Sequence, residues 1–338
     1  MSLLTLRDDL PDGILDCAAR DLHRLLPGPT LIHLRGRRTR PLFVSVLLHG
    51  NEVTGLTAIQ QVLRAHGPGD LPRSLILMIG NVSAAARGLR RLDGQPDYNR
   101  VWPGTLADPD APEVKAMARA HAHVLKAGAV CAIDLHNNTG RNPHYGVISS
   151  TDPKSLHLAS MFSPTVVWFR GLAGAQCSAF AGHMPSMTAE CGQPGLPENA
   201  AAAARFIEAV LALPDRPEAA ETAPGIALYH TLAVVRLPAE VTASFDGAPA
   251  DLRLAPDLDR LNFTDAPAGT VWGETRLVAP LSVLDEEGRD VADRFFRTED
   301  GRLRQVRRAT PAMITVDEHV VRQDCLGYLM ERIVLERN

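Results

Sequence analysis

The sequence is poor in tryptophan and tyrosine and carries little net charge, and these shortages exclude several kinds of partner. Its 338 residues include only 3 tryptophans and 4 tyrosines, and the formal net charge is −4. Basic stripes with interleaved aromatic residues, which nucleic-acid-binding surfaces use, do not occur. A charge this small also gives little attraction toward a polyanion or an acidic membrane surface. We therefore expect no nucleic-acid partner and no membrane partner.

Cysteine is also scarce, and paired cysteine motifs are missing. The cysteines show no C-x-x-C spacing and lie far apart, at Cys17, Cys131, Cys177, Cys191 and Cys325. This usage argues against a disulfide framework and suits a reducing compartment. The N-terminus turns acidic at once and does not resemble a signal peptide, and no apolar run approaches membrane-spanning length. These features predict a soluble, cytoplasmic protein.

Predicted strands and helices alternate along the first two thirds of the chain. Strand-like runs, several of them almost wholly apolar, occur at residues 30–34, 42–48, 74–80, 129–135, 145–149, 165–169 and 187–190. Helical periodicity occurs at residues 12–26, 53–66, 112–127 and 197–213. Between them, residues 82–110 predict a long functional loop, because they are rich in Arg, Gly, Asp and Pro. The alternation predicts a three-layer α/β fold with a mixed, largely parallel sheet.

The C-terminal third has a different pattern of predicted secondary structure. Residues 214–224 are rich in Pro, Glu and Ala, which is typical of a linker. Beyond them, short β-like pieces broken by Pro and Gly turns occur at residues 226–230, 233–237, 274–278 and 313–316. The length suits about two domains. We expect a catalytic domain over residues 1–222 and a smaller, mainly β domain over residues 223–338, which could cap the active-site cleft.

Polar residues stand where several predicted strands end. They are His49, Asn81, His136 and Glu190. In open α/β sheets the ligand crevice lies outside the carboxyl ends of the strands, so residues distant in sequence meet there. This pattern is the strongest internal indication of an active site.

A metal site is the first chemistry that the pattern indicates. His49 and Glu52 are three apart at the start of a helical pattern and can point the same way. With His136 they make two histidines and one carboxylate, a known catalytic zinc arrangement with a fourth position open. A lone H-x-x-E pair is more often incidental, and a lone histidine is more often a core residue. Asp134 shares a strand face with His136 and either orients it or is a plain structural carboxylate.

A base and an arginine-bearing loop complete the candidate constellation. Glu190 ends a mostly apolar strand and precedes a Gly/Pro turn, where it could accept a proton from water and pass it to a leaving amine. The alternative is a surface glutamate at a turn.

Residues 87–104 contain several arginines, which bind carboxylates in a fork and imply an anionic substrate. The alternative for this loop is a solvated basic surface.

Four segments together resemble a known family. They are HGNE at residues 49–52, DYNRVWPG at 97–104, DLHNNTG at 134–140 and AECGQPG at 189–195. In this order they are similar to the succinylglutamate desuccinylase/aspartoacylase family, a deacylase branch of the zinc carboxypeptidase-like hydrolases. The resemblance covers about residues 41–213. It implies a three-layer α/β/α zinc-carboxypeptidase-like domain that holds one Zn²⁺ per chain.

The resemblance also implies roles for the metal and base residues. His49, Glu52 and His136 would be the zinc ligands, and Glu190 would be the general base and acid. The family commonly has Glu-Val-Gly-Pro at the base, whereas this chain has Glu-Cys-Gly-Gln. The departure leaves the glutamate in register, and Cys191 beside it is expected to serve packing.

The remaining roles that the resemblance implies concern the substrate. Asn99 and Arg100 match the Asn-Arg pair that holds the substrate carboxylate. A further family arginine, thought to polarise the scissile carbonyl, falls at Arg90 or Arg91, and the loop length leaves both open.

These observations lead to one main functional expectation and two alternatives. We expect a zinc-dependent amidohydrolase that removes the acyl group from an N-acyl amino acid or a similar small carboxylate-bearing amide. The first alternative is a metallocarboxypeptidase acting on peptides, and the second is a catalytically silent binding protein of the same fold. The expected partner is thus a small molecule, and the sequence leaves a homo-oligomer open.

Overall fold

The computed structural model describes residues 3–67, 69–170, 172–215 and 225–333, and the chain divides into two compact units. The first unit comprises Met1–Asn137 and His144–Ile226, and the second comprises Asn138–Pro143 and Ala227–Asn338. The grouping of the short segment 138–143 with the C-terminal part was not predicted. The expected boundary at residues 222–223, and most of the linker expected at 214–224, lie outside the described residues.

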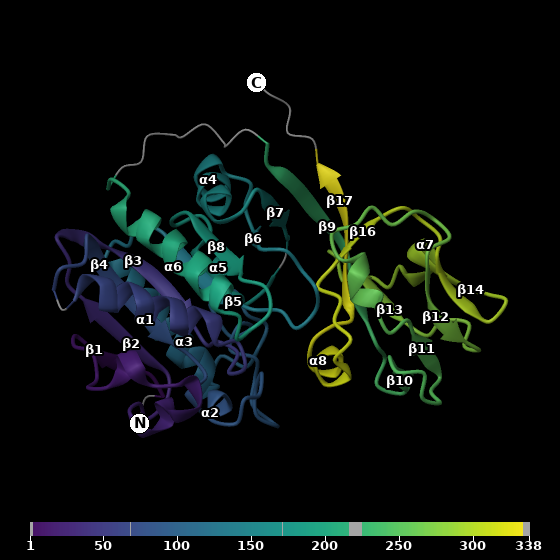
Figure 1. Ribbon diagram of the computed structural model, residues 1–338, viewed down its shortest axis with the longest axis horizontal. Coiled ribbons are helices and arrows are strands. Elements are labelled where there is room, and N and C mark those ends of the chain that lie inside the picture. Colours follow the sequence, from purple (N-terminus) through teal and green to yellow (C-terminus); the bar gives the residue numbers. More distant parts are fainter. Residues whose placement is uncertain (1–2, 68, 171, 216–224, 334–338) are drawn as a thin grey trace. The chain divides into compact units, whose positions relative to one another are not determined.

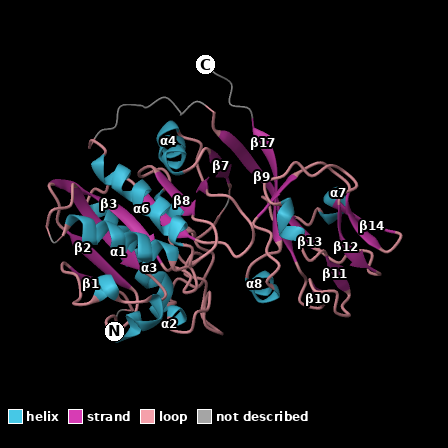
Figure 2. Cartoon of the chain, viewed as in Figure 1, coloured by secondary structure: helices cyan, strands magenta, loops and turns pink. Residues whose placement is uncertain are grey.

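The first unit is built on a mixed, largely parallel sheet, as predicted (Figures 1 and 2). Its strands pair in the order β1-β2-β4-β3-β5-β8-β6-β7. The central strands β4, β3, β5 and β8 all run in one direction, whereas β2 and β6 pair with this group in antiparallel fashion. In chain order the strands are β1 (Thr5–Arg7), β2 (Thr30–Leu34), β3 (Arg38–Val46), β4 (Arg73–Ile79), β5 (Ala132–His136), β6 (Tyr145–Ile148), β7 (Thr165–Trp168) and β8 (Ser186–Glu190).

Helices cover both faces of this sheet. They are α1 (Thr54–His66), α2 (Val82–Ala85), α3 (Pro112–Lys126), α4 (Pro153–Phe162), α5 (Gln176–Phe180) and α6 (Pro197–Ala212). Helix α1 packs against α6 and approaches the sheet at Gly55, where a Cβ would come within 3.1 Å of the Val46 side chain. Residues of α3 and α5 share a core with Phe43, which faces away from Val46 because side chains alternate along a strand. The three predicted layers are therefore present.

The helix predicted at residues 12–26 is not present as one element. Residues 12–26 do not form one helix but two 3₁₀ helices, η1 (Ile14–Asp16) and η2 (Ala19–Arg24). The side chain of Gln60 donates hydrogen bonds to the carbonyls of Ile14 and Cys17, both at 2.8 Å, so these carbonyls bond to α1 rather than along one continuous helix. Among the described residues, no helix is long and apolar enough to cross a membrane.

The second unit consists mainly of short strands. One group contains β9 (Ala227–Arg236), β13 (Ser282–Asp285), β16 (Thr310–Ala312) and β17 (Gly327–Ile333). The other sheet pairs in the order β10 (Ala243–Ser244), β11 (Leu252–Leu254), β12 (Val271–Thr275), β15 (Arg302–Gln305) and β14 (Phe296–Glu299). Short helical turns are η3 (Leu258–Leu261), α7 (Ala292–Phe295) and α8 (Glu318–Gln323).

The four strand predictions in this unit were inexact or wrong. The pieces expected at 226–230 and 233–237 form the single strand β9, and the strand expected at 274–278 lies earlier, at Val271–Thr275. The strand expected at 313–316 is wrong, because β16 ends at Ala312 and Met313 adopts a left-handed φ of 60°. A β-branched run alone cannot reveal such a turn.

Contacts within the second unit explain why segment 138–143 belongs to it. The Asn142 side chain accepts a 3.0 Å hydrogen bond from the Met313 backbone, and the hydroxyls of Thr139 and Thr315 lie 2.7 Å apart. Gly140 approaches the backbone so closely that a Cβ there would lie 1.8 Å from the carbonyl oxygen of Ile314. This close approach requires glycine. The last residues of the DLHNNTG motif therefore anchor the C-terminal part of the chain.

Candidate active site

The carboxyl ends of four neighbouring parallel strands define the candidate site. Strand β3 pairs with β4 and β5, and β5 pairs with β8, with His136 directly opposite Glu190. His49 follows β3 by three residues, after Leu47 adopts a left-handed φ of 56°. Strained backbone of this kind persists only where the surroundings hold it. The predicted gathering at the strand ends is thus present for these three residues.

Asn81, the fourth polar residue at a strand end, serves the backbone. Its side-chain oxygen accepts a 3.1 Å hydrogen bond from the N–H of Ala84, which caps α2, and its nitrogen donates to Gln95 at 2.9 Å. Asn81 therefore orders the loop that follows β4.

Two histidines and a glutamate form one buried group at this edge. His49, Glu52 and His136 each offer a ligand atom, and these atoms lie within 4.8 Å of one another. His49 Nδ1 is 2.8 Å from one oxygen of Glu52, and His136 Nδ1 is 2.7 Å from the other. All three side chains are buried. The group that the sequence pattern predicted is brought together and could hold a metal ion.

Carboxylates hold the opposite nitrogen of each histidine. His49 Nε2 lies 2.9 Å from Asp97, and His136 Nε2 lies 2.5 Å from Asp134, which also accepts a 2.6 Å hydrogen bond from Ser45. Metal-binding histidines almost always have such a partner, which fixes the ring and its tautomer and leaves the other nitrogen for the ion. The donor set and its supporting carboxylates therefore fit a metal such as zinc.

Asp97 is the site residue that sequence reasoning missed. It bridges two site residues, since one oxygen faces His49 and the other lies 3.0 Å from Arg90. Its one sequence signal was its place as the first residue of the DYNRVWPG segment, two before Asn99.

The charges in the group shift one another's pKa values. Burial alone would raise the pKa of Glu52, but the neighbouring His49 and His136 hold it well below its usual range. Burial alone would lower the pKa of His136, yet the charges of Asp134 and Glu52 raise it well above its ordinary value. In the metal-free protein these two carboxylates therefore favour the protonated form of His136.

The structure distinguishes the two candidate arginines. Arg90 is buried, and its guanidinium lies 3.4 Å from Glu52 and 3.0 Å from Asp97. Arg91 is half-buried and donates a 2.8 Å hydrogen bond to the carbonyl of Gln95 in its own loop. Arg90 is thus the arginine that reaches the buried group.

Asn99 and Arg100 lie on the same loop at the edge of the group. The buried Asn99 side chain lies 3.2 Å from His136 Nε2, and its oxygen accepts a 2.9 Å hydrogen bond from the N–H of Gln176 at the start of α5. Arg100 donates a 2.8 Å hydrogen bond to the Asn99 carbonyl, and its charge helps to lower the pKa of Asp97. Asn99 therefore reaches the group directly, and the Arg100 guanidinium is bound to the backbone beside it.

Glu190 ends strand β8 beside the group, and Cys191 follows it. Glu190 is buried at 7% exposure and opposes His136 in the strand register. Burial and the Glu190 charge raise the pKa of the Cys191 thiol well above its usual value, so the thiol stays protonated and is no nucleophile. This agrees with the packing role expected for Cys191.

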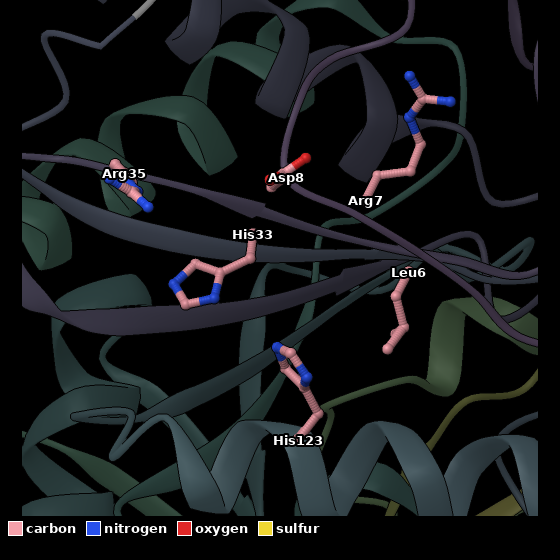
Figure 3. A pocket seen from close by; sticks show the side chains of 6 residues that line it. All are labelled: Leu6, Arg7, Asp8, His33, Arg35 and His123. Carbon is pink, nitrogen blue, oxygen red and sulfur yellow. The ribbon is translucent and has the colours of Figure 1, made fainter.

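A cavity of about 470 Å³ in the first unit has no residue in common with this group. It is lined by Leu6, Arg7, Asp8, His33, Arg35 and His123 (Figure 3). The rings of His33 and His123 pack edge to face with centroids 5.8 Å apart, and burial lowers the pKa of both. The Arg7 guanidinium is bound to Asp9 at 2.7 Å. We assign this cavity no part in the candidate site.

Comparison with known proteins decides the family. Residues 39–213 match the succinylglutamate desuccinylase/aspartoacylase catalytic domain. The chain belongs to the succinylglutamate desuccinylase/aspartoacylase family. The matched region contains every residue of the candidate site. No curated protein matches the sequence.

Solved structures show that this desuccinylase/aspartoacylase family member also shares the family's fold. The succinylglutamate desuccinylase from Chromobacterium violaceum is 17% identical with a TM-score of 0.59, over 88% of this chain and 86% of that one. The succinylglutamate desuccinylase/aspartoacylase from Rhodobacter sphaeroides is 18% identical with a TM-score of 0.57, over 89% and 88%. Murine aminoacylase 3 is 19% identical with a TM-score of 0.56, over 88% and 96%.

Metal binding to this family member should release protons. Because the pKa of His136 is raised, a metal ion that binds its neutral imidazole should displace a proton. Metal affinity should therefore rise with pH up to this raised pKa. Titration calorimetry with Zn²⁺ in buffers of different ionisation enthalpy should show a buffer-dependent heat, smaller in Asp134→Asn. A heat that is independent of the buffer would contradict the protonated state.

Proposed function

We propose that the protein is a zinc-dependent amidohydrolase that removes the acyl group from an N-acyl amino acid or a similar small carboxylate-bearing amide. The observation that carries this proposal is the buried His49–Glu52–His136 group with Glu190 directly opposite His136 on the adjacent strand. Family membership supports the reaction class, since the family and its solved relatives are named succinylglutamate desuccinylase, aspartoacylase and aminoacylase.

Zinc is the metal that suits this donor set best. Two imidazole nitrogens and one carboxylate are a known catalytic zinc set, and such sites leave the fourth position open. Zinc bound by His49, Glu52 and His136 would act as a Lewis acid on the amide carbonyl and make water more acidic. Asp97 and Asp134 would keep the two imidazoles in the tautomer that presents Nδ1 to the ion.

Glu190 supplies the proton transfers in this proposal. A carboxylate beside the attacking water takes its proton as the water adds to the carbonyl carbon, and then gives that proton to the leaving amine nitrogen. The buried position of Glu190 at the end of β8 keeps the transfer away from bulk water. Cleavage of the C–N bond then yields a carboxylate and a free amine.

The negative charges of the substrate and the transition state would be bound by Arg90, Asn99 and Arg100. Arg90 would stabilise the oxygen that becomes negative as water adds, a role supported by its buried guanidinium, which lies 3.4 Å from the ligand Glu52. Asn99 and Arg100 would hold the substrate carboxylate through a hydrogen bond and a charged fork. A substrate that lacks this carboxylate should therefore bind poorly.

A hydrolysis screen tests the proposed function. Zinc-loaded protein should release the amine from at least one N-acetyl, N-succinyl or N-formyl amino acid, and chelator-stripped protein should not. Amine release can be followed with an amine-reactive fluorophore. Release from peptides alone would favour the carboxypeptidase alternative, and a protein that neither binds zinc nor turns over any substrate would favour the silent binder.

Replacing the base should separate chemistry from metal binding. In the same assay Glu190→Gln should lower kcat by about 10²-fold or more, because the amide cannot accept the proton. Zinc content should stay at the wild-type level, since Glu190 is not one of the three ligands. Glu198→Gln, an exposed carboxylate at the start of α6, is the matched control and should remain fully active. Appreciable turnover by Glu190→Gln would remove Glu190 from this role.

Arg90 and its neighbour Arg91 allow a second comparison between a proposed catalytic residue and a control. Arg90→Ala should lower kcat by about 10²–10³-fold, as loss of one donor to a developing oxyanion does in other hydrolases. Arg91→Ala should stay near wild type, because Arg91 bonds only to its own loop in the contacts described above. Zinc content, measured alongside, shows whether any loss comes from the ligand Glu52. Equal losses in both variants would contradict the assignment of Arg90.

A further inference from the structure

Asn137, which directly follows His136 at the end of β5, is buried at 4% exposure, and its backbone N–H and side-chain amide are hydrogen-bonded. Its backbone N–H donates a 3.1 Å hydrogen bond to the Glu52 oxygen that also faces His136. Its side-chain oxygen accepts at 3.1 Å from the N–H of Thr54. Its side-chain nitrogen donates to the Thr54 hydroxyl at 2.9 Å and to the Gly192 carbonyl at 2.8 Å.

The partners allow one orientation of the Asn137 amide. The backbone N–H of Thr54 can only donate, and the carbonyl of Gly192 can only accept. A reversed amide would place donor against donor and acceptor against acceptor. The orientation of the Asn137 side chain is therefore fixed, and both its amide oxygen and its amide nitrogen are hydrogen-bonded.

These bonds join three parts of the candidate site. Thr54 begins α1, two residues after Glu52, so the amide oxygen holds the start of the helix that follows this ligand. Gly192 lies two residues after Glu190, in a left-handed turn with φ of 69°. The amide nitrogen therefore holds the turn that follows the proposed base.

A second asparagine steadies the same turn from the other side. The Asn199 side chain on α6 donates a 2.8 Å hydrogen bond to the carbonyl of Gln193, and its oxygen lies 2.8 Å from His144 Nε2. A Cβ on Gly192 would lie 3.0 Å from the Asn199 nitrogen, so the turn fits closely between its supports.

We propose that Asn137 is a positioning residue that fixes the separation between the Glu52 carboxylate and Glu190. This inference rests on the proposed function of the site. Asn137 itself touches neither the metal nor the substrate in this account, and it acts through Glu52, Thr54 and Gly192. Its loss would leave the Thr54 N–H and the Gly192 carbonyl without these buried partners, and both segments would move to regain hydrogen bonds.

The test uses two variants at Asn137 and a control from the same unit. Asn137→Ala removes both links, whereas Asn137→Asp keeps the shape and the acceptor for Thr54 but loses the donor to Gly192. Gln60→Ala is the control, because the buried Gln60 side chain also bonds two backbone carbonyls, away from the ligand group. The readouts are the zinc dissociation constant by chelator competition, the visible spectrum of the Co²⁺-loaded protein, kcat and KM at saturating zinc, and Tm.

The expected pattern separates positioning from general stability. Asn137→Ala should weaken zinc binding and lower kcat at saturating zinc, each by about 10–100-fold, as loss of outer-shell partners typically does. KM should change little, because Asn99 and Arg100 are untouched. Asn137→Asp should remain folded and lose kcat, and both variants should alter the Co²⁺ spectrum. Gln60→Ala should lower Tm only.

Two outcomes overturn the inference or separate it from the proposed function. Asn137 is merely structural if Asn137→Ala lowers Tm while its zinc dissociation constant, Co²⁺ spectrum and kcat match those of Gln60→Ala. If the wild type hydrolyses no substrate, the proposed function fails. In that case the zinc and Co²⁺ measurements still decide the role of Asn137, since unchanged values in Asn137→Ala would overturn it.

Discussion

The candidate site depends on the pairing of the buried Glu52 carboxylate with His49 and His136. Its two oxygens face Nδ1 of His49 and Nδ1 of His136 at 2.8 and 2.7 Å, and Arg90 and the backbone of Asn137 add further donors. Burying a carboxylate is costly unless it is paired and hydrogen-bonded. These donors therefore offset the cost of burying the Glu52 carboxylate in the first unit. The same requirement preorganises the residues that would bind the metal.

Sheet topology is what makes this pairing achievable. The strands β4, β3, β5 and β8 are neighbours that run in one direction, so their carboxyl ends meet at one edge. Parallel neighbours need long crossover connections, and this brings together residues that are far apart in the chain. Helix α1 lies in the crossover from β3 to β4, and α3 lies in the crossover from β4 to β5. The position of the site thus follows from the connectivity of the sheet.

The sequence predicted the parts of the site that lie at the ends of regular elements. Apolar runs that stop at a polar residue reveal strand ends, and the neighbours of each strand follow from the fold class. The long loop was harder, because irregular backbone has no periodicity that tells which of Arg90 and Arg91 points inward or that Asp97 reaches His49. The expected helix at residues 12–26 failed for a tertiary reason, since Gln60 binds carbonyls that one continuous helix would have used.

Zinc stoichiometry tests the central claim most directly. After equilibrium dialysis against Zn²⁺, wild-type protein should hold one zinc ion per chain, and His49→Ala and His136→Ala should each lose it. His230→Ala is the matched control, because His230 also pairs with a carboxylate, Glu286 at 2.7 Å, in the second unit. It should keep the full zinc content. Wild-type protein without stoichiometric zinc, or full retention by His136→Ala, would contradict the account.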